Sequence, residues 1–194
     1  MRSDYTLGLH SGGSRYRFHP LVQYYGLKRD VEEKSKAAAE AFAIGPFTII
    51  ERIPIPPVDV TCTYEASRNG VAGIEPEMWG EGRCLEEHVD EYVSSVMNVL
   101  SHLRIIKAPK KPKPDRVDVT EGEWVLANCG GLFVPSVRIR ENVTKNQRVG
   151  VIKDELGNIT EEVKAPATGF VGAMRTFPMI RPGDWAVLVE KMHP

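Results

Sequence analysis

A proline- and lysine-rich segment divides the chain into two parts with different sequence patterns. Residues 107–115 hold three prolines and four lysines. Proline interrupts helices and central strands, because it fixes φ and lacks a backbone N–H. The segment is therefore typical of a stiff, extended linker. We expect a first domain at residues 1–106, a linker at 107–117 and a second domain at 118–194.

The first part alternates between strand-like and helix-like patterns. Short apolar runs predict strands, and longer runs of helix-forming residues predict helices. The expected strands cover 5–10, 47–53 and 71–77, and the expected helices cover 29–44, 60–69 and 84–103. This alternation predicts an α/β domain, with a mixed sheet and flanking helices.

The expected helix at 84–103 has the clearest periodicity. Its apolar residues recur at spacings of three and four, which places them on one side of a helix. They are Leu85, Val89, Val93, Val96, Met97, Leu100 and Leu103. We expect this apolar stripe to be buried.

His19 directly precedes Pro20 and is expected in a loop.

Short apolar runs separated by glycine-containing turns follow the linker. They lie at 124–127, 131–134, 148–152, 159–163, 169–172 and 185–189. Short strands joined by tight turns predict a small all-β domain.

The composition fits a globular protein and limits its partners. Of the 194 residues, 42% are hydrophobic and 26% are charged, which is enough apolar material for a core. The net charge of −1 argues against a nucleic-acid partner, because phosphate binding needs a basic excess. No apolar run reaches the roughly 18 residues of a membrane span, and the first residues contain no signal-peptide core. The three cysteines lack a C-x-x-C pair and indicate reduced thiols, so we expect a cytoplasmic protein.

Two glycine-rich turns place polar side chains at the ends of expected strands. The first contains His10, in Gly-Leu-His-Ser-Gly-Gly, and the second contains Glu77, in Gly-Ile-Glu-Pro-Glu-Met-Trp-Gly-Glu-Gly-Arg. Histidine is a common zinc ligand, and a carboxylate beside a metal can act as general base. We expect the two side chains to converge on one pocket. A lone histidine is often structural, and Glu75 shares a strand face with Glu77, so the spacing leaves both roles open.

These segments, taken in order, resemble the succinylglutamate desuccinylase/aspartoacylase family of zinc-dependent amide hydrolases. The turn at 8–13 is similar to the family's D-L-H-[ST]-G-G motif, and the turn at 73–83 to its G-I-x-x-E-[ML]-G-G-x-G-R motif. The second part resembles the family's β-barrel-sandwich domain at 130–133, 165–169 and 180–184. The resemblance implies a partial carboxypeptidase-like α/β domain followed by a small β-barrel-sandwich domain.

The resemblance also implies roles for individual residues. His10 would be a zinc ligand, and Glu77 would carry the proton from the zinc-bound water to the leaving amine of a small N-acyl amino acid. Arg15, Arg17 and Arg68 lie close to the two turns in sequence and could bind an anionic substrate group through a bidentate guanidinium. The alternative for each arginine is an ordinary surface position.

The chain departs from the family pattern in three respects. Gly8 stands where an acidic residue is usual, and Trp79 stands where a glycine is usual. The family's first two zinc ligands come from an H-x-x-E motif upstream of the third ligand, whereas this chain starts essentially at the third. We therefore predict the C-terminal portion of a deacylase, with two of three ligands missing and with weak or absent zinc binding by the chain alone.

The missing part also bears on the partners that we expect. Self-association, or another chain that supplies the N-terminal part, would cover the surface left exposed by a partial sheet. The alternative function is a non-catalytic fragment or subunit that acts as a binding or assembly module.

Overall fold

The computed structural model describes residues 3–43, 48–52, 61–107 and 117–192. The contacts divide the chain into two compact units. Unit 1 comprises residues 1–10, 20–77 and 84–118, and unit 2 comprises residues 11–19, 78–83 and 119–194. The predicted linker at 107–117 falls outside the described residues except for its two end positions.

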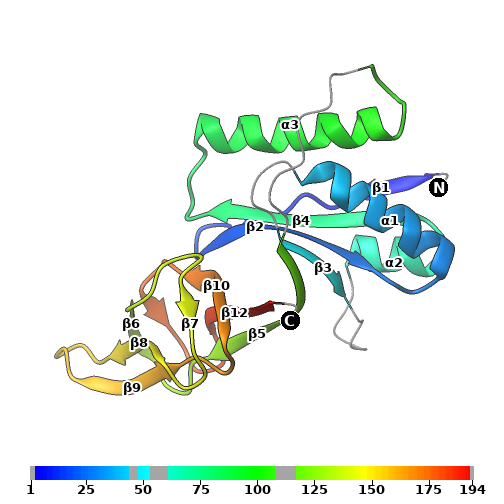
Figure 1. The fold of residues 1–194 in the computed structure, drawn as a ribbon. Coiled ribbons are helices and arrows are strands. Elements are labelled where there is room, and N and C mark those ends of the chain that lie inside the picture. The colour runs from blue at the N-terminus through cyan, green and yellow to red at the C-terminus, as the bar shows by residue number, and fades with distance from the viewer. Residues whose placement is uncertain (1–2, 44–47, 53–60, 108–116, 193–194) are drawn as a thin grey trace. The chain divides into compact units, whose positions relative to one another are not determined.

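Unit 1 combines helices with a set of adjacent strands (Figure 1). The helices are α1 (Arg29–Phe42), α2 (Cys62–Arg68) and α3 (Glu86–His102). The strands are β1 (Tyr5–Leu7), β2 (Tyr16–Tyr25), β3 (Thr48–Arg52), β4 (Ala72–Gly80) and the start of β5 (Val117–Leu126). Their order is β1-β4-β2-β3-β5, and β1–β4, β2–β3 and β3–β5 are parallel pairs. The α/β class predicted for this part of the chain is confirmed.

Strand β2 is the main element that the sequence patterns did not predict. Pro20 lies inside it, and His19 is buried in the strand rather than placed in a loop. Among the described residues, Tyr16 to Phe18 pair with β10 (Gly169–Arg175), and Leu21 to Tyr25 pair with β3. Pro20 therefore lies between the part of β2 that pairs with β10 and the part that pairs with β3.

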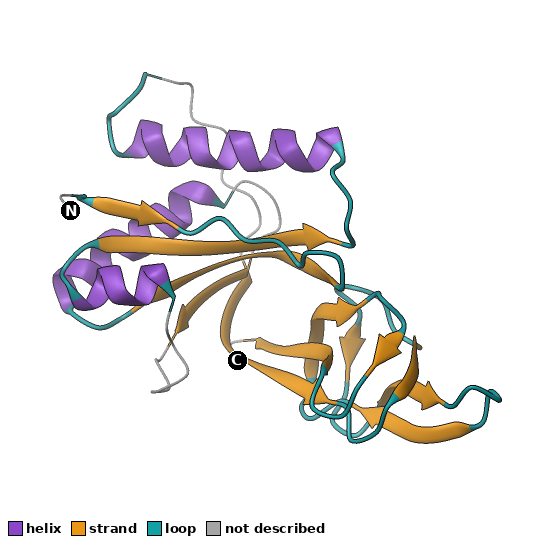
Figure 2. Cartoon of the chain, turned by 180° about the vertical axis from the view of Figure 1, so that it is seen from behind, coloured by secondary structure: helices purple, strands orange, loops and turns teal. Residues whose placement is uncertain are grey.

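Helix α3 forms as predicted, but three residues of its apolar stripe are exposed. The buried side chains of α3 are Ser95, Asn98 and Val99. Val89, Val93 and Met97 are 45%, 55% and 42% exposed. Helix α3 packs against α1 and lies at the periphery of unit 1 in both views (Figure 1, Figure 2). The prediction of a buried stripe is therefore wrong for these three residues.

The described regular elements of unit 2 are β-strands. They belong to two groups of adjacent strands. One has the order β5-β12-β10-β7, with β7 at Asn142–Val143 and β12 at Trp185–Met192. The other has the order β11-β6-β8-β9, at Met179–Ile180, Gly131–Pro135, Arg148–Lys153 and Ile159–Lys164. One apolar core, which includes Phe133, Ile152 and Val187, draws on both groups.

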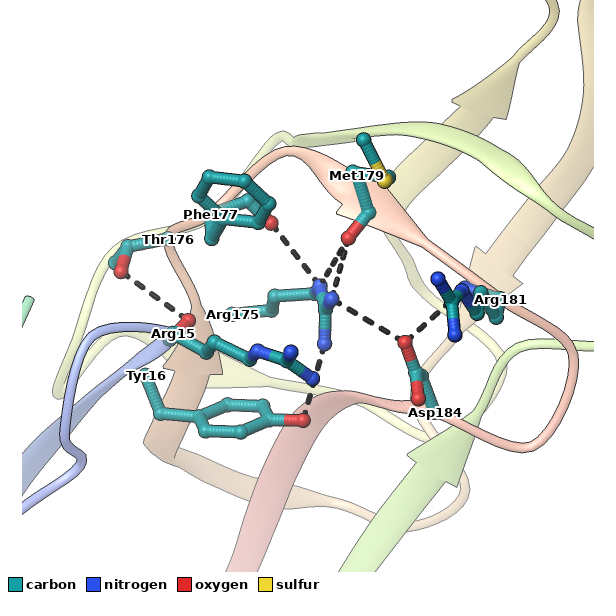
Figure 3. A network of polar contacts seen from close by, with 8 residues as sticks. All are labelled: Arg15, Tyr16, Arg175, Thr176, Phe177, Met179, Arg181 and Asp184. Carbon is teal, nitrogen blue, oxygen red and sulfur yellow. Dashed lines mark hydrogen bonds and ion pairs between the residues drawn. The ribbon is translucent and has the colours of Figure 1, made fainter.

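Arg175 is a buried cation that holds the turn before β12 (Figure 3). Its guanidinium donates to the carbonyl oxygens of Phe177 and Met179 and to the hydroxyl of Tyr16. It also forms an ion pair with Asp184 at 3.2 Å. A buried charge is tolerated when it is paired and its donors are satisfied, so these contacts account for the placement of Arg175.

None of the described helices has the length and apolar character needed to cross a membrane.

Candidate active site

The structure brings His10 and Glu77 side by side in unit 1. Strands β1 and β4 run parallel, with Tyr5 opposite Ala72 and Leu7 opposite Ile74. The same register continues past the end of β1, where His10 and Glu77 form an isolated parallel bridge. The backbone N–H of His10 donates to the carbonyl oxygen of Pro76 at 3.0 Å. Directly paired residues project from the same face of a sheet, so the side chains of His10 and Glu77 leave the two strand ends on the same face.

The same register separates Glu77 from Glu75. Both side chains belong to the same face of β4, but the pairing places Glu77 directly opposite His10. Glu75 is 4% exposed, whereas Glu77 is only partly buried. Of the two residues, Glu77 is therefore the one that pairs with His10 and remains partly accessible to solvent.

Burial gives the Glu77 carboxyl group an unusual affinity for protons. It raises the pKa of Glu77 to about 7, and the negative charge on Glu75 adds to this increase. Desolvation and a like charge both disfavour the ionised form of a carboxyl group. A pKa near neutrality lets a carboxyl group both accept and return a proton under ordinary conditions.

Tyr92 on α3 ties together the two chain segments that carry this pair. Its hydroxyl donates to the backbone carbonyl oxygen of His10 and lies 3.3 Å from that of Pro76. Burial raises the pKa of Tyr92, and the charge of Glu77 raises it further. The hydroxyl therefore stays protonated and remains a donor. No motif pointed to Tyr92 in the sequence, because a tyrosine within an amphipathic helix is ordinary.

Gly8 creates space that neighbouring polar groups occupy. A Cβ atom at this position would lie 3.2 Å from Oγ1 of Thr63, 3.3 Å from Cγ of Glu75 and 3.5 Å from Nε2 of His10. Thr63 Oγ1 and Glu75 Oε1 are buried and have no hydrogen-bond partner among the described residues. This chain therefore has Gly8 at the position where an acidic residue was expected. The side chain of Glu75, on the adjacent strand, lies beside Gly8.

The described residues do not by themselves fit a catalytic zinc site. Such a site needs three protein ligands and one open position. In the part of the chain that the structure describes, no group of three histidine, cysteine, aspartate or glutamate side chains is gathered for a metal. The sequence does contain one downstream H-x-x-E spacing, at His88 and Glu91. It lies on α3 and forms no such group.

The three candidate arginines are divided between the two units. Arg68 ends α2, forms an ion pair with Glu65 at 2.8 Å and lies over the ring of Tyr64. It precedes the start of β4, and Glu77 lies five residues into that strand, which is about 16 Å of extended chain. Arg15 and Arg17 belong to unit 2.

Within unit 2, Arg17 is already engaged. It forms an ion pair with Glu81 at 3.1 Å, and its guanidinium lies 5.5 Å from the ring centre of Trp79. The backbone of Trp79 has φ of 56°, a left-handed conformation that favours glycine. A tryptophan therefore occupies a conformation that glycine adopts more readily, and its ring makes a cation–π contact there. Arg15 contributes its backbone carbonyl oxygen, which accepts from the N–H of Thr176 at 2.8 Å.

Unit 1 has an α/β fold, with parallel strands and flanking helices. His10 and Glu77 pair with each other at the ends of two of these strands. Solved structures of succinylglutamate desuccinylase/aspartoacylase family proteins share this fold. The succinylglutamate desuccinylase from a Silicibacter species is 21% identical, with a TM-score of 0.86, over 98% of this chain and 59% of its own. The succinylglutamate desuccinylase/aspartoacylase from Rhodobacter sphaeroides is 23% identical, with a TM-score of 0.82, over 99% of this chain and 59% of its own.

A third similar structure is the product-bound ectoine utilization protein from Ruegeria pomeroyi. It is 20% identical, with a TM-score of 0.86, over 97% of this chain and 58% of its own. The chain therefore spans less than two thirds of the length of these structures. A scan against models of protein families and a search of curated proteins give no match. The predicted resemblance is confirmed at the level of the fold.

Proposed function

We propose that this chain is part of a zinc-dependent deacylase that hydrolyses the amide bond of a small N-acyl amino acid. The observation that carries the proposal is the in-register pair of His10 and Glu77 at the ends of two parallel strands. The fold supports it, because similar structures bear the names of desuccinylases and aspartoacylases. His10 would contribute one ligand to the metal. The remaining ligands would have to come from residues beyond those that the structure describes.

In this proposal Glu77 moves the proton that amide hydrolysis requires. A carboxylate must take a proton from the attacking water and then return one to the leaving amine nitrogen. The pKa of Glu77, about 7, matches both steps near neutral pH. Tyr92 fixes the backbone of His10 against that of Pro76, so we assign it a positioning role. Arg17 and Arg68 form ion pairs with Glu81 and Glu65, and Arg15 is engaged through its backbone carbonyl oxygen. All three remain candidates for binding an anionic group of the substrate.

Three further properties belong to this proposal. Unit 2 would be the family's barrel-sandwich domain, since it combines two groups of strands around one core. The location would be the cytoplasm, which agrees with Cys62, Cys84 and Cys129 all being free thiols. The substrate would be a small acylated amino acid.

A second candidate is a binding or assembly module without catalytic activity. The lack of a three-ligand group among the described residues favours it. The genomic DNA next to the first codon discriminates the two candidates. A reading frame there that encodes an H-x-x-E motif would favour the deacylase, and its absence would favour the module.

Metal content and hydrolysis, measured together, test the proposed function. The purified chain alone should hold clearly less than one zinc per molecule and should hydrolyse N-succinyl and N-acetyl amino acids weakly or not at all. Co-expression with a polypeptide that carries the H-x-x-E motif should restore both properties. Full zinc occupancy with robust turnover by the chain alone would show that its ligand set is complete. Restored zinc without hydrolysis of either substrate class would contradict the deacylase.

A further inference from the structure

The backbone pairing of β4 shifts by one residue directly after Glu77. The N–H of His10 donates to the carbonyl oxygen of Pro76 at 3.0 Å. Two residues later, the N–H of Gly12 donates to the carbonyl oxygen of Trp79 at 3.2 Å, whereas an unchanged register would pair it with the residue before Trp79. One extra residue on one strand is the arrangement of a β-bulge. Bulges redirect the side chains beside them, and Glu77 is one of the two residues that this bulge contains.

The bulge and the turn after it contain two residues with an unfavourable backbone conformation. Trp79 has φ of 56° and Glu81 has φ of 63°, and both values lie in the left-handed region. This conformation costs free energy in a residue that has a Cβ atom, whereas glycine adopts it readily. Strained residues of this kind persist where surrounding contacts hold them in place. The contacts of these two side chains should therefore account for the shape of the turn.

Arg17 contacts both strained residues. Its Nη1 donates to Oε2 of Glu81 at 3.1 Å, and its guanidinium carbon lies 5.5 Å from the ring centre of Trp79. The ion pair is partly shielded from water, with 38% of the Arg17 side chain and 21% of the Glu81 side chain exposed. Arg17 lies in β2, where it pairs with Met174 of β10. A side chain anchored in a sheet thus connects the two left-handed positions.

We propose that Arg17 is a positioning residue that stabilises the bulge after Glu77 by binding Trp79 and Glu81 together. Without the guanidinium, both strained residues lose a contact that holds them, so the turn should open more often. The bulge includes Glu77, and a catalytic group displaced by about 1 Å can lose about 10²-fold in rate. The stabilisation of the bulge is a property of this chain alone, whereas its consequence for Glu77 rests on the proposed function.

The alternative for Arg17 is an ordinary ion pair that contributes little. Arg68 offers a matched comparison, because it makes the same two kinds of contact. It pairs with Glu65 at 2.8 Å and lies 5.7 Å from the ring centre of Tyr64. Both of its partners belong to the helix α2, so they need no such support. Loss of the Arg68 guanidinium should therefore leave the local backbone unchanged, unlike loss of the Arg17 guanidinium.

Amide hydrogen exchange of the whole chain, followed by NMR, tests the stabilisation of the bulge without any need for activity. The N–H groups of Glu81 and Gly82 donate to backbone carbonyl oxygens at 2.9 and 2.7 Å and report on the turn. Arg17→Met should accelerate exchange at both by about tenfold, while the bonded amide of Phe133 in the same unit keeps its rate. Arg68→Met should leave all three rates unchanged. No acceleration at the turn, or equal acceleration at Phe133, would overturn the proposal.

Glycine substitutions test whether strain is the reason that the turn depends on Arg17. In a background with Trp79→Gly and Glu81→Gly, both positions adopt the left-handed conformation readily. Arg17→Met should then accelerate exchange at Gly12 and Gly82 by less than about twofold. The comparison is made within each background, so the added freedom of glycine in the unfolded chain cancels. An equally large acceleration in both backgrounds would show that Arg17 does not act on these strained residues.

Turnover tests the consequence for Glu77 separately. In an assembly with restored zinc and turnover, Arg17→Met should lower kcat by about tenfold and leave KM nearly unchanged, and the two glycine substitutions should restore most of kcat. A higher KM with unchanged kcat would overturn the positioning role and assign Arg17 to substrate binding. An assembly that binds zinc and hydrolyses neither substrate class would contradict the proposed function, and hydrogen exchange would still decide whether Arg17 stabilises the bulge.

Discussion

The hydroxyl of Tyr92, on α3, donates a hydrogen bond to the backbone carbonyl oxygen of His10, just beyond the end of β1. The contact links residues that lie 82 positions apart and holds the chain at the point where His10 pairs with Glu77. Because burial keeps the pKa of Tyr92 above its ordinary value, its hydroxyl stays protonated and remains a donor over the pH range in which proteins are normally handled.

Tyr92→Phe should therefore lower the stability of the chain and loosen the strand end. The change removes the hydroxyl that donates to His10 and Pro76 and keeps the aromatic ring. The centre of this ring lies 6.0 Å from that of the Phe42 ring. The expected loss is about 1 kcal/mol of unfolding free energy, measured by urea denaturation. Tyr64→Phe is the matched control, because the described residues give the Tyr64 hydroxyl no hydrogen bond. Equal effects of both changes would contradict this role for Tyr92.

Restoring an acidic residue at position 8 should be destabilising in this chain. Gly8→Asp places a side chain against Thr63, Glu75 and His10 and adds a second carboxyl group beside a buried one. Overpacking typically costs about 1–3 kcal/mol. Glu75→Ala should remove much of this conflict, so the double variant should be more stable than the sum of the single effects predicts. A double-mutant cycle on unfolding free energies measures this coupling, and simple additivity would show that Gly8 and Glu75 are independent.

The helices of unit 1 were predictable because their composition and periodicity are local properties. The burial of the α3 stripe was not, since periodicity shows which side of a helix is apolar but not whether anything covers it. Val93 illustrates the difference, because it occupies the expected face and is nevertheless 55% exposed.

Strand β2 was not predicted, for a related reason. Pro20 signals a break in any local pattern, whereas the residues on either side of it form a strand by pairing with distant segments, Phe18 with β10 and Leu21 with β3. The site was partly predictable, since the motif order pointed to His10 and Glu77. Tyr92 and the space at Gly8 depend on contacts between distant segments, which a single sequence does not reveal.

The assignment of the general base predicts a clear difference between two neighbouring glutamates. In an assembly with restored zinc and turnover, Glu77→Gln should lower kcat by about 10²-fold or more, the usual contribution of a positioned acid–base group. Zinc content should stay unchanged. Glu75→Gln should affect stability more than kcat, because Glu75 is buried beside Gly8. If Glu75→Gln alone abolished turnover, the assignment of the base would be wrong.

His19 predicts a pH dependence of stability. Burial lowers the pKa of His19 to about 4, and the charge on Arg140 contributes to the decrease. In the unfolded chain the ordinary pKa is near 6.5. Between pH 6.5 and 4 the unfolded state therefore binds more protons than the folded state, so stability falls as the pH falls. The expected contribution of His19 is a loss of about 3 kcal/mol by pH 4.

His19→Phe should remove this contribution. The imidazole packs edge-on against Phe170 with the ring centres 6.0 Å apart, and a phenyl ring can take its place. The drop in unfolding free energy between pH 7 and pH 4 should then be smaller in the variant by about 3 kcal/mol. Denaturant unfolding at both pH values measures the difference. An identical drop in both proteins would show that His19 does not titrate in this range.

Arg175 should be among the most sensitive positions in unit 2. Arg175→Met keeps much of the side-chain volume but leaves Asp184 without its ion pair and removes the donor to Tyr16. Breaking a buried ion pair by removing one partner costs about 3–5 kcal/mol. Asp184 is 28% exposed, so we expect a loss of unfolding free energy near the lower end of that range. Arg181→Met is the matched control, since the bond from Arg181 to Asp184 uses its backbone N–H. The control should lose less than about 0.5 kcal/mol in thermal or urea unfolding, and a similar loss in both variants would show that the buried guanidinium does not organise this turn.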